Sequence, residues 1–93
     1  MYKYGRGVAK DESAAVEWYR KSAEQGYATA QCSLGWMYEN GRGVAKDEAA
    51  AVEWYRKSAE QGNACAQRNL GLSYAYGRGV AKDESAAVEW YRK

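Results

Sequence analysis

The chain has 93 residues, which is enough for one small domain with a modest core. Its 14 basic and 12 acidic residues leave a formal net charge of +2, so charge alone gives no drive toward nucleic acid or an anionic membrane. Histidine is absent, which removes the commonest general base and the commonest metal ligand. No apolar run reaches the roughly 18–20 residues of a membrane span, and the N-terminus lacks a secretory signal, so we expect a cytoplasmic protein.

The large apolar side chains are mostly aromatic. Four Trp and nine Tyr accompany 17 Ala, whereas there are only three Leu and no Phe. Small alanine faces let helices approach closely, and aromatic rings fill the gaps between them. Because proline is absent and β-branched residues are few, the composition favours an all-α fold built from thin layers of helices.

A repeat of 36 residues organises the chain. Residues 5–26 recur at 41–62 with one substitution, and residues 77–93 repeat the sequence of 5–21 without change. Such a period is typical of stacked helical repeats, in which each unit contacts its neighbours. The repeat divides the chain into three parts: a partial repeat at 1–26, a full repeat at 27–62 and a truncated repeat at 63–93.

Two helices are predicted in each full period. In chain order, the predicted helices cover roughly residues 11–25, 28–39, 47–61, 64–75 and 83 to the end. Asp11, Asp47 and Asp83 follow glycine-containing loops, where a carboxylate accepts the free N–H groups of a first helical turn. Gly26 and Gly62 are predicted to end the helices before them, because glycine adopts a positive φ most easily.

The helix at 11–25 has an apolar arc that spans nearly half its circumference. The arc consists of Ala15, Val16, Trp18, Tyr19, Ser22 and Ala23. An arc this wide contacts more than one neighbouring helix. We expect the tryptophans at this position of each copy to form the core between layers, and the loop valines to plug the layer beneath. These residues are Trp18, Trp54 and Trp90, and Val8, Val44 and Val80.

The pattern resembles the Sel1-like repeat, a relative of the tetratricopeptide repeat. In the full repeat the resemblance is carried by Ala30, Leu34, Gly35, Tyr38, Gly41, Gly43, Val44, Asp47, Ala51, Trp54, Ala59 and Gly62. In the next repeat it is carried by Ala66, Leu70, Gly71, Tyr74, Gly77 and Gly79. Ser22 and Ser58 depart from the alanine that the family usually has, and a buried serine there can bond to the carbonyl four residues before it.

This resemblance implies an all-α fold. The implied architecture is an α/α solenoid, a right-handed superhelix of 36-residue helix-turn-helix repeats with about five helices. It also implies that the helices at 28–39 and 64–75 line the concave side. The activity that it implies is that of an adaptor or scaffold rather than an enzyme.

The two helices at 28–39 and 64–75 differ on one face only. At about 100° per residue, the positions that are identical in both copies lie on one half of the helix and the varied positions on the other. Packing therefore does not dictate the varied half, which we call the variable strip. We assign partner binding on this strip to Thr29, Cys32, Ser33, Trp36, Met37, Asn40, Cys65, Arg68, Asn69, Leu72, Ser73 and Tyr76; Glu39 and Ala75 share the same half.

Trp, Met, Leu and Tyr edged by Arg and Asn are typical of a protein-binding hot spot. We therefore expect the strip to bind a protein or peptide. One alternative is that Trp36, Met37 and Leu72 are buried against adjacent helices. A second alternative is a structural one: a fragment or engineered piece of a longer array that self-associates through its open ends and has no specific ligand.

Other chemistry has little support. The loop Gly5-Arg6-Gly7 matches no phosphate-binding motif, and the basic residues of each copy stand beside Asp and Glu, so we expect no nucleic-acid ligand. No catalytic triad is present and two cysteines are too few for zinc, so we expect no catalysis, metal or cofactor. Cys65 aligns one helical turn before the level of Cys32, and helix axes lie roughly 8–10 Å apart, so a disulfide between them is not expected.

Overall fold

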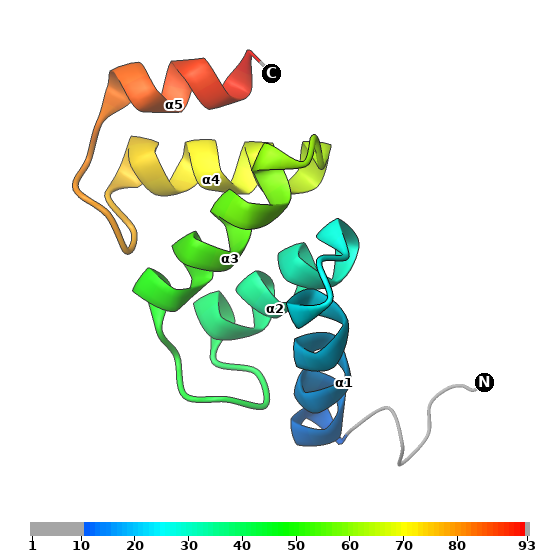
Figure 1. The fold of residues 1–93 in the computed structure, drawn as a ribbon. Coiled ribbons are helices and arrows are strands. Elements are labelled where there is room, and N and C mark those ends of the chain that lie inside the picture. Colours follow the sequence, from blue (N-terminus) through cyan, green and yellow to red (C-terminus); the bar gives the residue numbers. More distant parts are fainter. Residues whose placement is uncertain (1–10, 93) are drawn as a thin grey trace.

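The computed structural model describes residues 11–92, which form five helices stacked in chain order (Figure 1). The helices are α1 (Glu12–Glu24), α2 (Ala28–Asn40), α3 (Glu48–Glu60), α4 (Ala64–Tyr76) and α5 (Glu84–Tyr91). Each helix packs against the next one along the chain, and the molecule measures 43 × 23 × 21 Å. This elongated helical stack confirms the predicted α/α solenoid. None of these helices combines the length and apolar character that crossing a bilayer requires, as far as residues 11–92 go.

The predicted N-caps are confirmed. The carboxylates of Asp11, Asp47 and Asp83 accept the backbone N–H of the residue three positions later, at 3.0, 3.0 and 3.1 Å. These bonds begin α1, α3 and α5 at the residue after each aspartate. The predicted ends at Gly26 and Gly62 are also confirmed, since both have the positive φ that a residue after a helix end needs (97° and 93°).

Glycine allows α2 to lie against α3. A Cβ on Gly35 would lie 2.9 Å from two carbons of the Tyr55 ring, so a larger residue has no room there. The same contact recurs one repeat later, where a Cβ on Gly71 would lie 2.7 Å from the Tyr91 ring. The close approach of each helix pair therefore depends on a glycine facing a tyrosine.

The core consists of two clusters, and α2 contributes residues to both. One cluster is made of Val16, Ala23, Ala30, Leu34 and Met37 from α1 and α2. The other is made of Cys32, Ala51, Val52, Tyr55, Ala59, Ala66 and Leu70 from α2, α3 and α4. Val44 packs against the first cluster and Val80 against the second, which confirms the predicted role of these loop valines; Val8 lies outside the described residues.

The prediction for the three tryptophans is confirmed at two positions and wrong at the third. Trp54 packs against the α1–α2 cluster and Trp90 against the cluster of α2, α3 and α4, so both join neighbouring layers. Trp18 is 70% exposed. Within the described residues no helix precedes α1, so the surface that buries Trp54 has no counterpart at Trp18.

Side-chain hydrogen bonds also join neighbouring helices. The Ser58 hydroxyl donates to the carbonyl of Ala28 at 2.6 Å and not to the carbonyl four residues before it. Ser58 therefore ties α3 to the start of α2 rather than satisfying its own helix. The Gln31 side chain donates to the carbonyl of Ala23 at 3.1 Å, and Gln67 repeats this contact with Ala59 at the same distance.

Candidate functional site

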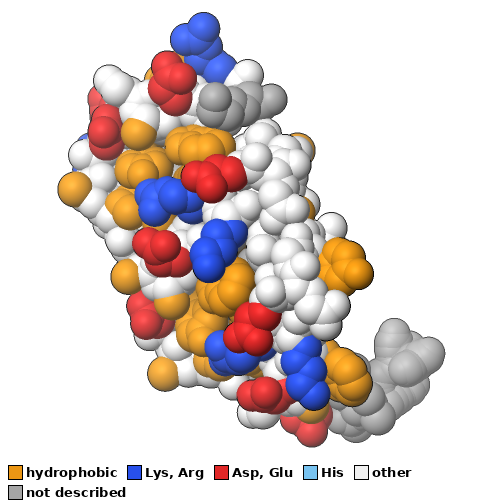
Figure 2. Space-filling model, viewed as in Figure 1, with side chains coloured by type: hydrophobic (Ala, Val, Ile, Leu, Met, Phe, Trp, Pro, Cys, Tyr) orange, Lys and Arg blue, Asp and Glu red, His pale blue; other side chains and the backbone are white. Residues whose placement is uncertain are grey.

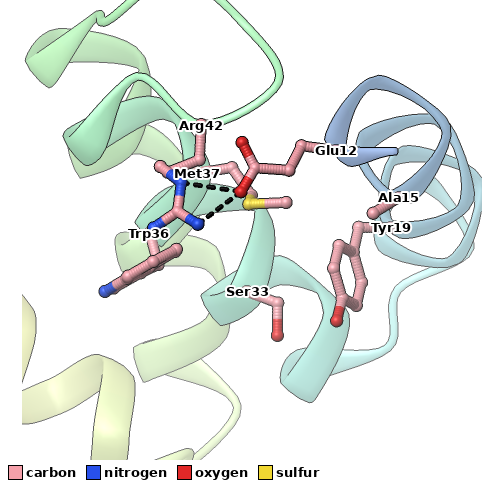
Figure 3. Close-up of a pocket in the computed structure, with 7 residues that line it drawn as sticks. All are labelled: Glu12, Ala15, Tyr19, Ser33, Trp36, Met37 and Arg42. Carbon is pink, nitrogen blue, oxygen red and sulfur yellow. Dashed lines mark hydrogen bonds and ion pairs between the residues drawn. The ribbon is translucent and has the colours of Figure 1, made fainter. Parts of the chain in front are cut away.

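A pocket of about 320 Å³ lies between α1, α2 and the loop that follows α2 (Figure 3). It is lined by Glu12, Ala15, Tyr19, Ser33, Trp36, Met37 and Arg42. Figure 3 shows Ser33 between the rings of Trp36 and Tyr19, so aromatic walls stand on both sides of a small polar side chain. This volume is at the lower end of ligand pockets and suits one or two side chains of a partner.

One wall of the pocket belongs to α1. Glu12, Ala15 and Tyr19 are three, then four residues apart, so they lie along one face of the helix. Tyr19 is 39% exposed, whereas Tyr55, its counterpart in the next repeat, is fully buried. The pocket therefore exposes an aromatic ring that the same sequence buries elsewhere in the molecule.

The opposite wall belongs to α2 and includes part of the variable strip. Trp36 is 44% exposed, Ser33 is half-buried and Met37 is buried. Met37 belongs to the core and Trp36 remains accessible at the rim. The Asn40 side chain donates to the carbonyl of Trp36 at 2.9 Å, which satisfies a carbonyl near the end of α2.

Arg42 closes the rim of the pocket with two interactions. Its Nε donates to Oε2 of Glu12 at 2.8 Å, and its Nη2 donates to the same oxygen. The guanidinium carbon also lies 5.4 Å from the centroid of the Trp36 ring, within the range of a cation–π contact. The hydrogen bond from Arg42 lowers the pKa of Glu12 and raises the pKa of Arg42, so both groups are charged at neutral pH.

The strip residues differ in exposure. Thr29, Trp36, Asn40, Cys65, Arg68 and Tyr76 are exposed; Ser33, Asn69 and Leu72 are half-buried; Cys32, Met37 and Ser73 are buried. The expectation of an exposed strip is wrong for the last three residues. Met37 and Cys32 belong to the two core clusters, and the Ser73 hydroxyl donates to the carbonyl of Asn69 at 3.1 Å.

The middle of the strip brings two cysteines close together. The Asn69 side-chain nitrogen lies 3.9 Å from Sγ of Cys32 and 3.8 Å from Sγ of Cys65. Both thiols are free. Burial, together with the neighbouring Cys65 thiol, raises the pKa of Cys32 to about 12, so Cys32 stays protonated at neutral pH.

At the second repeat the loop arginine has other partners. Arg78 is 3.5 Å from Oε2 of Glu39, and its guanidinium carbon lies 5.2 Å from the centroid of the Tyr76 ring. The other carboxylate oxygen of Glu39 accepts a hydrogen bond of 2.6 Å from the Tyr55 hydroxyl. Glu39 therefore connects a buried tyrosine of α3 to the loop after α4.

The α1 wall and Arg42 were not expected in a site. The sequence analysis placed Tyr19 in the apolar arc of the helix at 11–25 and assigned no site role to Glu12 or Arg42. Only the comparison of Tyr19 with its buried counterpart reveals the pocket. The useful signal was that a tyrosine of the core type stands on α1, the first helix of the described residues.

The described residues offer no group of three or more Cys, Asp or Glu side chains that could hold a metal ion. Charges on the face in Figure 2 alternate in sign, with Lys and Arg next to Asp and Glu. The geometry of the pocket, with apolar walls and a charged rim, suits an apolar side chain flanked by polar groups.

These features define a helical tandem-repeat protein whose exposed side chains gather beside a pocket between repeats. The Sel1 repeat matches residues 1–27, 28–63 and 66–93, and the chain belongs to the Sel1 repeat family. No curated protein matches the chain significantly.

Two solved structures are similar to this chain. A protective antigen of uropathogenic Escherichia coli strains, which has an SLR fold, is 45% identical with a TM-score of 0.87. The match covers 88% of this chain and 18% of that protein. A Sel1 repeat protein from Oxalobacter formigenes is 46% identical with a TM-score of 0.83, over 86% of this chain and 33% of that protein. The chain thus spans a minor part of each of these proteins.

Proposed function

We propose that the chain is a non-catalytic protein-interaction module that binds a peptide or partner surface along the exposed part of the variable strip. The observation that carries this proposal is Trp36, which remains 44% exposed at the rim of the α1–α2 pocket. Partially exposed Trp beside Arg is the composition of binding hot spots. Repeat modules of this kind usually bind proteins.

The second half of the strip extends this surface. Arg68 and Tyr76 are exposed on α4, and Leu72 is half-buried between them. An apolar position between polar ones resembles the centre and rim of a small interface. The proposed partner therefore contacts both α2 and α4, with its main anchor at Trp36.

A test uses the chain as bait in a lysate of its source cells. The Trp36→Glu variant is expected to retain at least about tenfold less of the partner, because losing a hot-spot residue costs about 2 kcal/mol or more. The control is Trp18→Glu, which alters a more exposed tryptophan outside the strip. Circular dichroism of each variant must show unchanged helix content.

Loss of the same partner from both variants would contradict a specific site at the strip. Retention by both would show that Trp36 does not contribute, and the strip would then not be the binding surface.

Self-association is a second candidate function, favoured by the 70% exposure of Trp18 on α1. Its counterpart Trp54 packs against the preceding helices, so the exposed ring has an apolar surface suited to a second copy. The molecular mass in light scattering is then expected to rise with concentration for the parent chain and not for Trp18→Glu. A constant mass for the parent would count against this function.

A further inference from the structure

We propose that Cys32 and Cys65 form a reversible disulfide that links α2 to α4, with a small-molecule disulfide such as oxidised glutathione as the oxidant. The two residues lie in the middle of the variable strip, where one repeat meets the next, and both carry free thiols. This modification site is independent of the proposed function, because it needs only the two thiols and no partner protein.

One turn of α4 lies beside Cys32. Asn69 stands one helical turn after Cys65, and its side-chain nitrogen lies 3.9 Å from Sγ of Cys32 and 3.8 Å from Sγ of Cys65. Cys32 also belongs to the same core cluster as Ala66 of α4. The Cys65 thiol contributes to the raised pKa of Cys32, which it does only at short range, so the two thiols are direct neighbours.

The separation of neighbouring helices permits the bond. The repeat alignment predicts no bridge, since Cys65 aligns one turn before the level of Cys32 and helix axes lie roughly 8–10 Å apart. Cα atoms, however, lie about 2.3 Å from the axis of their own helix. Residues that face one another therefore come within the roughly 7 Å that a disulfide spans between Cα atoms. The shared contact with Asn69 indicates that the two cysteines face one another in this way.

Cys65 is the accessible thiol, and its exposure does not depend on where the described residues end. Its counterpart one repeat earlier is Thr29, which stays exposed although α4 follows α2 in the stack. A further repeat after α4 would leave Cys65 exposed in the same way. Cys32 is buried in a cluster formed by α2, α3 and α4, and all three helices are described.

The reaction begins at the exposed thiol. The Cys65 thiolate attacks one sulfur of oxidised glutathione, the bond between the two glutathione sulfurs breaks, and one glutathione leaves as a thiolate that takes up a proton. Cys32 then gives up its proton and attacks the Cys65 sulfur, and the second glutathione leaves. The chain loses two protons and two electrons, and the oxidant becomes two molecules of glutathione.

The surroundings of Cys32 make it the second thiol to react. Burial raises the pKa of Cys32 to about 12, and the thiolate is the form that attacks, so Cys32 does not react directly with an oxidant in solution. The positive charge of Arg68 on α4 opposes this rise. Once Cys65 carries glutathione, its sulfur is the electrophile beside Cys32, and the second step needs no access from solvent.

The test equilibrates the full chain with reduced and oxidised glutathione, in native buffer and in denaturing urea. N-ethylmaleimide then traps the remaining thiols, and the mass of the intact chain distinguishes the dithiol, the mixed disulfide and the internal disulfide. We expect the internal disulfide to be favoured at least about tenfold more in the native chain than in urea, because the fold holds the two sulfur atoms together. Circular dichroism of the oxidised chain should show unchanged helix content.

The matched control exchanges two adjacent residues of α4, Ala64→Cys together with Cys65→Ala. Both positions are exposed, so the number of thiols and their accessibility are kept. The new thiol, however, stands about 100° away around the helix. We expect this variant to stop at the mixed disulfide in native buffer. Cys32→Ser should also stop there, because it leaves no second thiol to close the bond.

Three results would overturn the inference. The first is an internal disulfide that is no more favoured in the native chain than in urea. The second is equal formation of the internal disulfide in the exchange variant. The third is a loss of helix content on oxidation, since the bond would then form only in an unfolded chain. A native product limited to the mixed disulfide or to disulfide-linked dimers would overturn it as well.

Discussion

Cys32 and Cys65 show how far two residues of one type can differ within a small repeat protein. Both contact the side chain of Asn69, yet Cys32 is buried in the core and Cys65 is exposed. The alignment of the repeats placed them one helical turn apart and predicted no disulfide between them. The side-chain amide of Asn69 on α4 lies near both sulfur atoms, one on α2 and one on α4.

The two thiols are expected to react at very different rates. In the folded chain Cys65 should react with a thiol reagent such as iodoacetamide, whereas Cys32 should be protected because it is buried and protonated. Mass spectrometry of the digested protein identifies the modified residue. Equal modification of both cysteines at neutral pH would contradict this environment, and unfolding in urea provides the fully reactive control.

Stability is expected to fall as the pH rises from about 9 to about 12. Burial raises the pKa of Cys32 from 9.0 to about 12, so the unfolded chain loses this proton first and is favoured as the pH increases. The pKa of Tyr55 is also raised, chiefly by burial, and acts in the same direction. Urea titrations at several pH values should therefore show a steeper loss for the parent than for Cys32→Ala. Parallel curves for the two proteins would contradict the assignment to Cys32.

At the level of the helices, local sequence sets where each element begins and ends. All five predicted helices are present, with bounds within one or two residues of those expected. Helices α1, α3 and α5 begin directly after an aspartate cap, and α1 to α4 each end one or two residues before a glycine of positive φ. Two equivalent helices nevertheless differ in capping. Asn63 accepts the N–H of Ala66 at 2.8 Å at the start of α4, whereas Tyr27 makes no side-chain bond at the start of α2.

This difference predicts opposite effects of two exchanges. Tyr27→Asn should raise the free energy of unfolding by about 1 kcal/mol, because it supplies the missing cap at a residue with nearly the same backbone angles as Asn63. Asn63→Tyr should lower it by a similar amount. Urea denaturation followed by circular dichroism measures both. If the two variants change stability in the same direction, the capping account is wrong.

At the level of the whole molecule, the stacking of repeats decides which of several identical side chains becomes core. Helices α1 and α3 have nearly the same sequence, but Tyr55 is fully buried and Tyr19 is not. The reason is the presence of α2 over α3. The pocket beside Tyr19 is thus a product of the position of α1 in the described stack rather than of its sequence.

The tryptophans provide a test of this stacking. Trp54→Ala should destabilise the chain by roughly 2 kcal/mol, because Trp54 packs against the preceding layer. Trp18→Ala should change stability by less than about 0.5 kcal/mol, as for most exposed positions. Each tryptophan ring also has the ammonium group of a lysine over its face, with 4.9 Å from Lys57 Nζ to the Trp54 centroid and 5.3 Å from Lys21 Nζ to the Trp18 centroid. Both variants lose this cation–π contact, so its contribution to stability largely cancels when they are compared. Equal losses in the two variants would show that the layers do not stack in this way.

The amino-acid sequence alone was enough to establish the repeat, the helices, the aspartate caps and the glycine ends, because each depends on residues within a few positions of one another. It also separated the varied half of α2 and α4 from the packed half. It did not show that Cys32, Met37 and Ser73 are buried, since their burial depends on how neighbouring helices pack.

The tertiary arrangement settled the features that identical sequences leave open. Arg42 and Arg78 stand in identical loops, yet one pairs with Glu12 and the other with Glu39. The choice depends on whether a helix carrying a carboxylate lies beside the arginine, and residues far apart in the chain determine that. For the same physical reason the pocket at Tyr19 emerges only when the helices are placed in space.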